Sequence, residues 1–266
     1  ALQQMGVECW HAPYAARFPA WLREHGARFH TVMVSRHYVA SEFFPLLRQH
    51  APQARLLFDT VDLHYLRERR AAELAGDPAA RRAADATRSR ELQLINAADA
   101  TLVVSGIERE LLATDAPNAQ VQVLSNLHHV ADDGPGWDAR CDLLFVGGFR
   151  HPPNVDAVQW FVGEVLPRIR NALPGITFHC IGGDVPDAIA RLAATPGVRI
   201  HGHVPELAPW LDGCRISVAP LRYGAGVKGK VNQAMAHGLP VVATSAAVEG
   251  MHLQDGMDAL VADDAA

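Results

Sequence analysis

Residues 214–244 read CRISVAPLRYGAGVKGKVNQAMAHGLPVVAT, and two β-rich runs in this stretch flank a glycine-rich turn and a helical segment. The two runs are residues 216–219 and 241–244, and the helical segment spans residues 231–237. Gly238 stands directly after this segment, where glycine commonly ends a helix. The order strand, helix, strand is the unit of a parallel sheet that helices cover.

The same alternation continues along the rest of the chain. In the first half it predicts strands at residues 7–11, 31–35, 55–60, 101–105 and 121–124, and helices at 15–24, 63–75, 81–97 and 107–113. In the second half it adds strands at residues 143–146, 177–181, 198–201 and 259–261, and helices at 155–171 and 186–194. Few of these strands alternate polar and apolar residues, so we expect both of their faces to be buried.

The pattern breaks once, in the sequence LHHVADDGPGWDAR at residues 127–140. Acidic residues, glycine and proline gather there, as in a linker. A chain of 266 residues has room for two domains of ordinary size. We therefore predict an α/β protein with an N-terminal domain at 1–126, a linker at 127–140 and a C-terminal domain at 141–266. Two doubly wound sheets would face each other across a cleft and bind ligands outside the carboxyl ends of their strands.

The amino-acid composition limits which binding partners and which cellular compartment we expect. The net charge is −5, which does not favour nucleic acid as a partner. The cysteines form no CxxC pair, so we expect no metal cluster and a reducing, cytoplasmic setting; they are Cys9, Cys141, Cys180 and Cys214. No apolar run approaches the roughly 20 residues of a membrane span. The chain begins ALQQM, without an initiator methionine or a signal region, so we expect the N-terminal domain to lack its first unit.

A local basic segment contrasts with the negative chain. Residues 213–248 contain no Asp or Glu, and Lys228 and Lys230 are the only lysines among 24 Lys and Arg residues. Both precede the helix that follows the glycines, where the helix dipole disfavours a cation by about 0.3–1 kcal/mol. A phosphate bound at the same place would make the cations favourable there, because it attracts both the ammonium groups and the helix N-terminus. Glycines that allow close approach, helix N–H groups and two ammonium groups together indicate a diphosphate site.

Two familiar glycine patterns also match here, and we consider both accidental. Gly224 to Gly229 fits GxGxxG, and Gly224 to Lys230 fits GxxxxGK. Val231 stands where a P-loop needs a hydroxyl for magnesium. A dinucleotide fingerprint should open a domain, yet little more than one βα unit follows Gly229. These points disfavour a P-loop ATPase and a dehydrogenase.

Several segments in order resemble the family 4 retaining glycosyltransferases. APLRYGAGVKGKVNQAMAHGLPVVATSAAVEGM (219–251) is similar to their donor-binding motif, and FVGGFRHPPNVDAVQWFVGEVLPRI (145–169) to the start of their C-terminal domain. LLFDTVDLHYLRERRAAEL (56–74) and ADATLVVSGIERELL (98–112) resemble later parts of their N-terminal domain. The resemblance implies the GT-B fold of two Rossmann-like domains. It also implies retaining sugar transfer from a nucleotide-sugar without a metal or other cofactor, and a glycan or lipid-linked acceptor.

The resemblance also assigns roles to residues. Lys228 and Lys230 match the basic positions of the GxGxKxK motif and would stabilise the leaving diphosphate, while His64 falls where the N-terminal domain presents a histidine to the transferred sugar. Asn126 would end the last N-terminal strand near the hinge. The expected donor-binding residues are Gly147, Gly148, Gly202, His203, Val204, Gly224, Gly226 and Gln233.

Three positions depart from the family pattern. Its two glutamates, separated by seven residues, are Ala225 and Gln233 here. Gln233 keeps one acceptor for the ribose hydroxyls but no charge, which predicts donor binding weaker by about 1–2 kcal/mol. An arginine often follows the FVG sequence, where this chain has Gly148; Arg150 is the candidate substitute.

Other polar residues have simpler interpretations. His201 and His203 would share one face of a strand, as a metal pair could, but no third ligand is spaced to help. Asp59 and Asp62 follow a strand and are expected to cap the next helix. The arginines of residues 67–90 alternate with acids, which is typical of a salt-bridged helix surface. The alternative for these arginines is contact with a lipid-linked acceptor at the inner face of a membrane.

The sequence thus predicts a retaining glycosyltransferase of glycan or polysaccharide assembly. Two alternatives remain: a GT-B nucleotide-sugar 2-epimerase, and a non-catalytic module that binds a nucleotide-sugar. The missing glutamates favour the binding module, and they speak against the epimerase, which would need carboxylates as acid and base.

Overall fold

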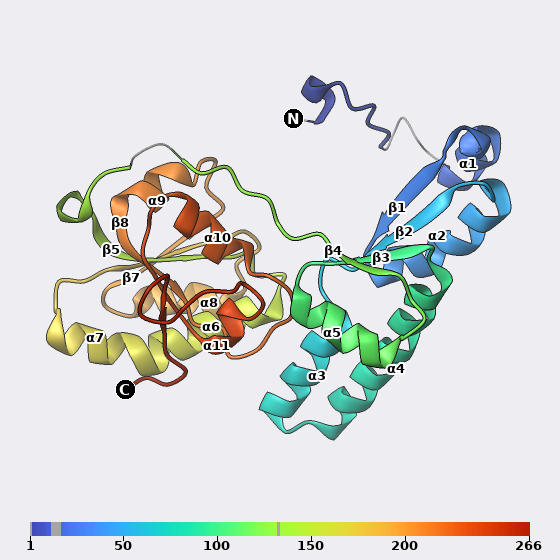
Figure 1. The fold of residues 1–266 in the computed structure, drawn as a ribbon. Coiled ribbons are helices and arrows are strands. Elements are labelled where there is room, and N and C mark those ends of the chain that lie inside the picture. The colour runs from blue at the N-terminus through green and yellow to red at the C-terminus, as the bar shows by residue number, and fades with distance from the viewer. Residues whose placement is uncertain (1, 12–16, 132–133) are drawn as a thin grey trace.

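The computed structural model describes residues 2–11, 17–131 and 134–266, and two parallel sheets organise them (Figure 1). The four-stranded sheet has the order β1-β2-β3-β4. Its strands are β1 (Thr31–Ser35), β2 (Arg55–Asp59), β3 (Ala100–Val103) and β4 (Val121–Val123). The two sheets lie side by side, and residues 124–140 pass between them without a strand among the described residues.

The second sheet has six strands in the order β10-β9-β8-β5-β6-β7. They are β5 (Cys141–Val146), β6 (Phe178–Ile181), β7 (Val198–Gly202), β8 (Cys214–Ala219), β9 (Val241–Ala243) and β10 (Leu260–Val261). Counted from β5 along the chain, this is the doubly wound order 3-2-1-4-5-6. The order reverses between β5 and β8, so the loops that leave these two strands diverge and open a crevice at their carboxyl ends.

Helices cover both sheets. Those of the first half are α1 (Phe18–His25), α2 (His37–His50), α3 (His64–Ala75), α4 (Pro78–Ala97) and α5 (Gly106–Asp115). Those of the second half are α6 (Pro152–Trp160), the π-helical η4 (Phe161–Val165), α7 (Leu166–Ala172), α8 (Asp187–Ala190), α9 (Ala208–Gly213), α10 (Gly229–Ala236) and α11 (Ser245–Val248). Each sheet has its own apolar core, with Phe58 central to the first and Phe145 and Phe178 to the second.

Local sequence explains the projecting hairpin of α3 and α4 (Figure 1). Helix α3 ends at Gly76, whose φ of 62° lies in the left-handed region that glycine adopts at low cost. Asp77 then caps α4, because its side chain accepts hydrogen bonds from the N–H groups of Ala79 and Ala80 at 2.8 and 3.1 Å. Pro78 occupies the first helical position, where its missing N–H costs nothing.

The expected α/β fold with two parallel sheets is confirmed. The six-stranded sheet is doubly wound, whereas the strands of the four-stranded sheet follow one another in chain order without a reversal. Three further details of the prediction are wrong. Residues 7–11 form no strand. Helix α2, which no pattern predicted, covers one face of the first sheet. Strand β1 is not buried on both faces, since it is an edge strand and Met33 is 55% exposed. Residues 15 and 16 of the helix expected at 15–24 lie outside the described residues. The domain bounds stay a prediction, which the lack of a strand at residues 124–131 and 134–140 supports.

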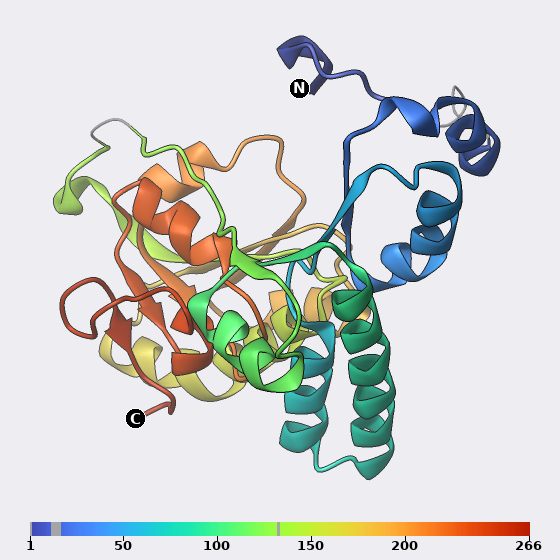
Figure 2. The same cartoon turned by 45° about the vertical axis from the view of Figure 1, so that its right-hand side comes forward.

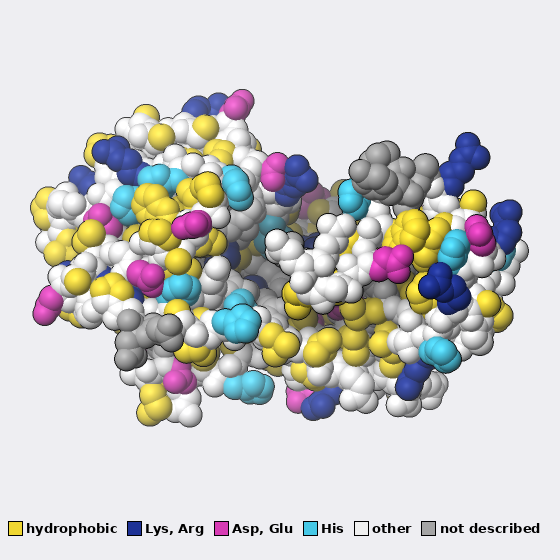
Figure 3. Space-filling model, turned by 90° about the horizontal axis from the view of Figure 1, so that it is seen from above, with side chains coloured by type: hydrophobic (Ala, Val, Ile, Leu, Met, Phe, Trp, Pro, Cys, Tyr) yellow, Lys and Arg dark blue, Asp and Glu magenta, His cyan; other side chains and the backbone are white. Residues whose placement is uncertain are grey.

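The two halves touch through side chains as well as through the connecting segment. Arg70 of α3 pairs with Glu249, which follows α11, at 2.6 and 2.8 Å. Asn126 donates a hydrogen bond to the carbonyl of Val227 at 3.3 Å. Figure 2 shows α3 and α5 next to the second half after a 45° turn. From above, the surface is hollowed between the two lobes (Figure 3). Among the described helices, none is both long and apolar enough to cross a membrane.

Candidate functional site

The candidate site lies where the order of the six-stranded sheet reverses. The loop after β5 carries Gly147 and Gly148, and the loop after β8 carries Gly224, Gly226 and Lys228. Because β5 and β8 are hydrogen-bonded neighbours, their carboxyl ends bring these two loops together. The two glycine motifs that the sequence singled out therefore border one crevice.

Lys228 is the residue that directly precedes α10 and is only 8% exposed. Its ammonium donates hydrogen bonds to the carbonyls of Ala225 and Gly226 at 3.1 and 2.5 Å. These carbonyls offset the unfavourable field of the helix N-terminus, which the sequence argument left out. Lys228 therefore lies inside the glycine loop and does not point into bulk water.

Lys230 lies in the first turn of α10 and reaches toward the other glycine loop. Its ammonium donates a hydrogen bond to Oδ1 of Asn154 at 2.5 Å and lies 4.2 Å from the centre of the Phe145 ring. A Cβ atom added to Gly147 would lie 2.8 Å from this ammonium, so only glycine fits there. Lys230 thus joins the loops after β5 and β8.

Loss of water makes both ammonium groups unusually acidic. Burial lowers the pKa of Lys228 to about 8, although the charges of Glu249 and Glu108 act in the opposite direction. Burial lowers the pKa of Lys230 to about 7, and the charge of Lys228 adds to this effect. Near neutral pH the site therefore carries positive charge that lacks its usual hydration and would be stabilised by an anion.

The first half of the chain closes the site from the opposite side. Gly226 has a φ of +68°, and a Cβ there would lie 3.0 Å from the Cβ of Asp62 and 3.2 Å from Cγ2 of Val104. Asp62 also pairs with Arg67. Nδ1 of His64 lies 3.2 Å from the carbonyl of Asp62 and 3.3 Å from its carboxylate. His64 and the glycine loop of Lys228 therefore meet through Asp62.

Two buried glutamates hold His64 in place. Glu91 of α4 accepts hydrogen bonds from the N–H groups of His64 and Tyr65 at 3.2 and 2.8 Å. Glu108 of α5 accepts one from Leu63 at 3.1 Å. These carboxylates from other helices cap the start of α3. The expectation that Asp59 or Asp62 caps this helix is therefore wrong, since no side chain of its own turn does so.

Histidines line the same region and are held neutral. Burial is the largest cause that lowers the pKa of His64, and it lowers those of His37 and His151 to about 4. His151 directly precedes α6, and the charges of Arg67, Lys228 and Lys230 also act on it. The rings of His37 and His64 lie 4.7 Å apart. Neutral imidazoles can offer hydrogen bonds to sugar hydroxyls without repelling the ammonium groups.

The remaining predicted donor residues extend along the same edge of the sheet. The carbonyl of Gly202 accepts a hydrogen bond from the N–H of Gly182 at 2.9 Å, and Gly182 packs on the carbonyl of Gly147. A Cβ atom added to Gly183 would lie 3.8 Å from the Cβ of His203, and Val204 follows His203 in the same loop. Gln233 is half-buried on α10, about one turn after Lys230. The carbonyl of Gly224 accepts a hydrogen bond from Arg70 at 2.7 Å.

Three smaller expectations change. His201 and His203 do not share a strand face: β7 ends at Gly202, whose φ is +67°, and His201 instead contacts His179 at 3.0 Å. Arg150 is exposed and pairs with Asp184 at 2.9 Å. The arginines of residues 67–90 are not one solvated surface. Arg69 pairs with Glu73 on the surface of α3, whereas Arg70 pairs with Glu249 of the other half. Arg67 pairs with Asp62, next to Gly226.

Sequence reasoning missed the residues that join distant segments. Their contacts are mostly with residues that lie far away in the chain, apart from one local side-chain bond of Glu108 and one of Asn154 to Gly148. These residues are Asn154, Arg70, Glu249, Glu91 and Glu108. The absence of acids between residues 213 and 248 did signal a positive segment, but nothing local signalled its partners.

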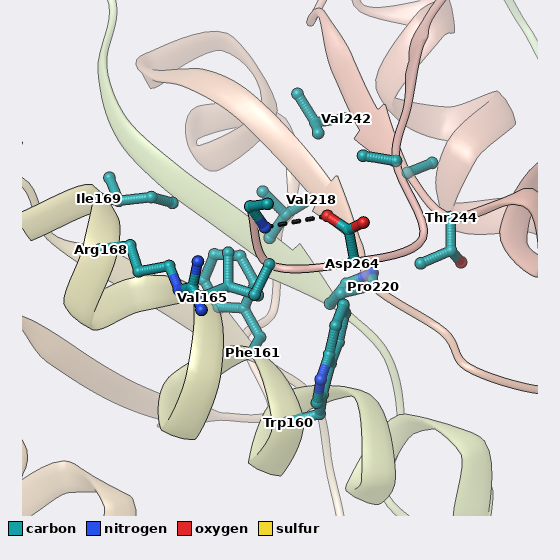
Figure 4. A pocket seen from close by; sticks show the side chains of 14 residues that line it. Trp160, Phe161, Val165, Arg168, Ile169, Val218, Pro220, Val242, Thr244 and Asp264 are labelled. Atoms are coloured by element: carbon teal, nitrogen blue, oxygen red, sulfur yellow. Dashed lines mark hydrogen bonds between the residues drawn. The ribbon is translucent and has the colours of Figure 1, made fainter. Parts of the chain in front are cut away.

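A separate, mostly apolar pocket lies away from the two lysines and is chemically less suitable for a nucleotide. It lies between α6–η4–α7 and strands β8 and β9 and encloses about 330 Å³ (Figure 4). Its polar side chains are Arg168, Thr244 and Asp264, and neither candidate lysine lines it. Such a pocket offers little to a nucleoside diphosphate.

The loops after β5 and β8 together form an arrangement that suits an anion. They bring together two ammonium groups, glycine backbone and the first turn of α10, and glycine backbone at a helix N-terminus is a common anion site. In the part of the chain that the structure describes, no group of three or more His, Cys, Asp or Glu residues could hold a metal ion.

Comparison with known proteins finds a family match for the second half of the chain. Residues 140–266 match the family described as "Glycosyl transferases group 1". An "Uncharacterized 44.6 kDa protein in cps region" of Klebsiella pneumoniae is 29% identical over 133 residues, which cover 47% of this chain and 34% of that protein. The match thus spans about a third of that relative's length.

Solved structures show the fold of both halves. Sucrose-phosphate synthase from Thermosynechococcus elongatus superposes with a TM-score of 0.70 at 17% identity, covering 93% of this chain and 63% of the synthase. Anabaena HepE, solved in complex with UDP and glucose, superposes with a TM-score of 0.71 at 12% identity, covering 99% of this chain and 74% of HepE. The fold is therefore the expected GT-B fold.

Proposed function

With residues 140–266 forming a glycosyl transferases group 1 domain, we propose that this chain transfers a sugar from a nucleotide-sugar to a glycan or lipid-linked acceptor, with retention at the anomeric carbon. The observation that carries the proposal is the convergence of the chain's two lysines on the glycine loops after β5 and β8. A similar fold in HepE was solved with UDP and glucose, which supports a nucleoside diphosphate as the leaving group. The cps-region relative supports a role in polysaccharide synthesis.

The proposed chemistry places negative charge where the protein holds positive charge. As the bond between the anomeric carbon and the phosphate oxygen breaks, both electrons leave with the diphosphate. Lys228, Lys230 and the first N–H groups of α10 stabilise that charge. The acceptor hydroxyl attacks the same face of the sugar, and its proton passes to the departing phosphate oxygen. His64, neutral and held by Asp62, orients the sugar.

In this proposal the loops have separate tasks. Gly147 and Gly148 bring backbone close to the diphosphate, as do Gly224 and Gly226. Gly202, His203 and Val204 lie beside the nucleotide base, and Gln233 accepts a hydrogen bond from the ribose. The first half of the chain, including α3, binds the acceptor.

Thermal unfolding with a panel of nucleoside diphosphates tests the donor site. We expect at least one of uridine, guanosine, adenosine and thymidine diphosphate to raise the melting temperature of the wild type. Lys228→Ala and Lys230→Ala should remove this increase, and Arg191→Ala, which changes an exposed arginine outside the site, should keep it. If no nucleotide stabilises the wild type, the proposed function is wrong.

Turnover then separates the enzyme from the alternatives. With a nucleotide-sugar and glycan acceptors, a transferase releases nucleoside diphosphate in proportion to the acceptor consumed. An epimerase would interconvert or hydrolyse the donor without an acceptor. Nucleotide binding without either reaction would favour the non-catalytic module, to which Ala225 and Gln233 in place of two glutamates give some support.

A further inference from the structure

The side-chain amide of Asn154 connects Lys230 to the glycine loop after β5. Asn154 lies in the first turn of α6 and is 5% exposed. Its Nδ2 donates a hydrogen bond to the carbonyl of Gly148 at 2.7 Å, and its Oδ1 accepts one from the Lys230 ammonium at 2.5 Å. An ammonium can only donate and a carbonyl can only accept, so the two partners fix the orientation of the amide.

No other common side chain meets both requirements at this length. An aspartate would bring a carboxylate oxygen against the carbonyl of Gly148, and a leucine would satisfy neither partner. The space is also closed on the remaining side. A Cβ on Gly147 would lie 2.7 Å from Nδ2 of Asn154 and 2.8 Å from the ammonium. Asparagine, glycine and lysine therefore fit together as one packed unit.

The surroundings of the ammonium make this contact important. The face of the Phe145 ring lies 4.2 Å from it, and the buried thiol of Cys180 is near enough to act on its charge. An aromatic face and a thiol replace the lost water only in part. The Asn154 oxygen is therefore the strong acceptor that keeps a charged amine at this position.

We propose that Asn154 is a positioning residue that holds the Lys230 ammonium against the Gly147–Gly148 turn, so that the charge and the turn meet the diphosphate of the donor as one rigid group. The proposal rests on the proposed function for its ligand and on the described contacts for its geometry. In this proposal a residue of α6, which belongs to neither glycine motif, sets how the loop after β5 and Lys230 meet a diphosphate.

The two lysines of the chain allow a direct test by NMR. Protein labelled with ¹³C at lysine Cε should give two ε signals, which Lys228→Arg assigns. We expect Asn154→Asp to raise the pKa of Lys230 by about one unit or more, because a carboxylate favours the ammonium. Asn154→Leu should lower it, because the charged form loses its acceptor. Asn154→Ala replaces the leucine variant if that protein does not fold.

A purely structural role would not shift the pKa of Lys230 in opposite directions. Asn171 of α7 is exposed and gives a matched control, since Asn171→Asp and Asn171→Leu should leave both lysine signals as in the wild type. If the pKa of Lys230 is the same in Asn154→Asp, Asn154→Leu and the wild type, or if it moves in one direction in both variants, the proposal is wrong.

Nucleotide affinity, measured by calorimetry on the same proteins with the diphosphates of the melting experiment, tests the link to the donor. Both Asn154 variants should weaken binding about tenfold or more, because one disturbs the charge and the other the position of Lys230. Unchanged affinity together with shifted lysine signals would overturn the assignment to the donor. If the wild type binds no nucleotide, the proposed function fails, and the lysine titration still decides whether Asn154 positions the amine.

Discussion

At the residue scale, Lys228 and Lys230 hold charges that have lost much of their hydration. The pKa of one is lowered to about 8 and that of the other to about 7, in both cases chiefly by burial. A diphosphate bound between them favours the ammonium forms and raises both pKa values. Binding of the anion and uptake of protons are therefore linked.

This linkage predicts how donor affinity changes with pH. Below pH 7 both amines are charged before the nucleotide binds. The lysines then take up no proton on binding, so their contribution to the nucleotide affinity is at its highest. As the pH rises through about 7 and then about 8, each deprotonated amine must regain a proton, so affinity should fall. Isothermal titration calorimetry from pH 6 to pH 9.5 measures this decrease.

Arginine provides the control, because it does not titrate in this range. In Lys230→Arg the decrease that begins near pH 7 should disappear, while the one near pH 8 remains. An affinity for nucleotide that is constant from pH 6 to pH 9.5 in the wild type would contradict the linkage.

Gln233 gives a second prediction at this scale. Restoring a carboxylate with Gln233→Glu should tighten binding of a nucleoside diphosphate about tenfold, since a charge-assisted hydrogen bond to the ribose replaces a neutral one. Gln233→Leu, which removes the acceptor, should weaken it. Calorimetry with the ribose and 2′,3′-dideoxyribose forms of the nucleotide measures the effect. Equal affinities for the two forms in every variant would show that Gln233 does not meet the ribose.

Local sequence patterns could identify only some of the residues of the site. Lys228, Lys230 and their glycines follow one another within seven residues, so their spacing carries the signal. Asn154 is 76 residues from Lys230, and Arg70 is 179 residues from Glu249. Such pairs depend on how strands β5 and β8 and the two halves come together, which local patterns do not determine.

At the element scale, α3 is notable because carboxylates from α4 and α5 cap its first turn. Glu91 is fully buried, and burial raises its pKa to about 7, while its two backbone hydrogen bonds act in the opposite direction. These bonds fix the start of the helix that carries His64. The cap therefore connects the packing of the first half to a residue of the site.

Replacing this cap should destabilise the protein measurably. Glu91→Gln keeps the shape but offers one acceptor oxygen to two N–H groups, so the free energy of unfolding should decrease by about 1–3 kcal/mol. Urea unfolding at pH 6 measures the change, because as the pH rises through about 7 the buried carboxylate ionises and the wild type itself loses stability. Glu110→Gln on the exposed side of α5 should have little effect. Equal losses of stability in the two variants would contradict the capping role.

The elements themselves were mostly predictable, for a physical reason. Buried parallel strands read as short apolar runs between polar turns, and glycine and proline mark the ends of α3, α4 and α10. Helix α2 was missed because Pro45 and the histidines at its two ends interrupt the expected pattern. Residues 7–11 have the composition of a strand, but Trp10 packs against Trp21 of α1 instead.

At the scale of the whole molecule, Arg70 links the two halves directly beside the site. It pairs with both carboxylate oxygens of Glu249 and donates to the carbonyl of Gly224 at 2.7 Å. The same helix carries His64 as its first residue. Helix α3 therefore connects the acceptor side of the proposed site to the loop that carries Lys228.

Breaking this link should allow the halves to separate. Arg70→Ala should increase the radius of gyration in solution and weaken nucleotide binding, because the glycine loop loses an anchor. The exchange Arg70→Glu with Glu249→Arg should restore part of the compactness. Arg69→Ala, which removes a surface pair on the same helix, should leave both quantities unchanged. Small-angle X-ray scattering that gives equal radii for Arg70→Ala and the wild type would contradict this role.

The most direct measurement for the whole account is a crystal structure of the chain soaked with uridine diphosphate. We predict that the two phosphates lie between the Gly147–Gly148 turn and the first turn of α10, with the ammonium groups of Lys228 and Lys230 within hydrogen-bonding distance. A nucleotide bound elsewhere, with Lys228 still donating to the carbonyls of Ala225 and Gly226 and Lys230 still donating to Asn154 alone, would contradict the account.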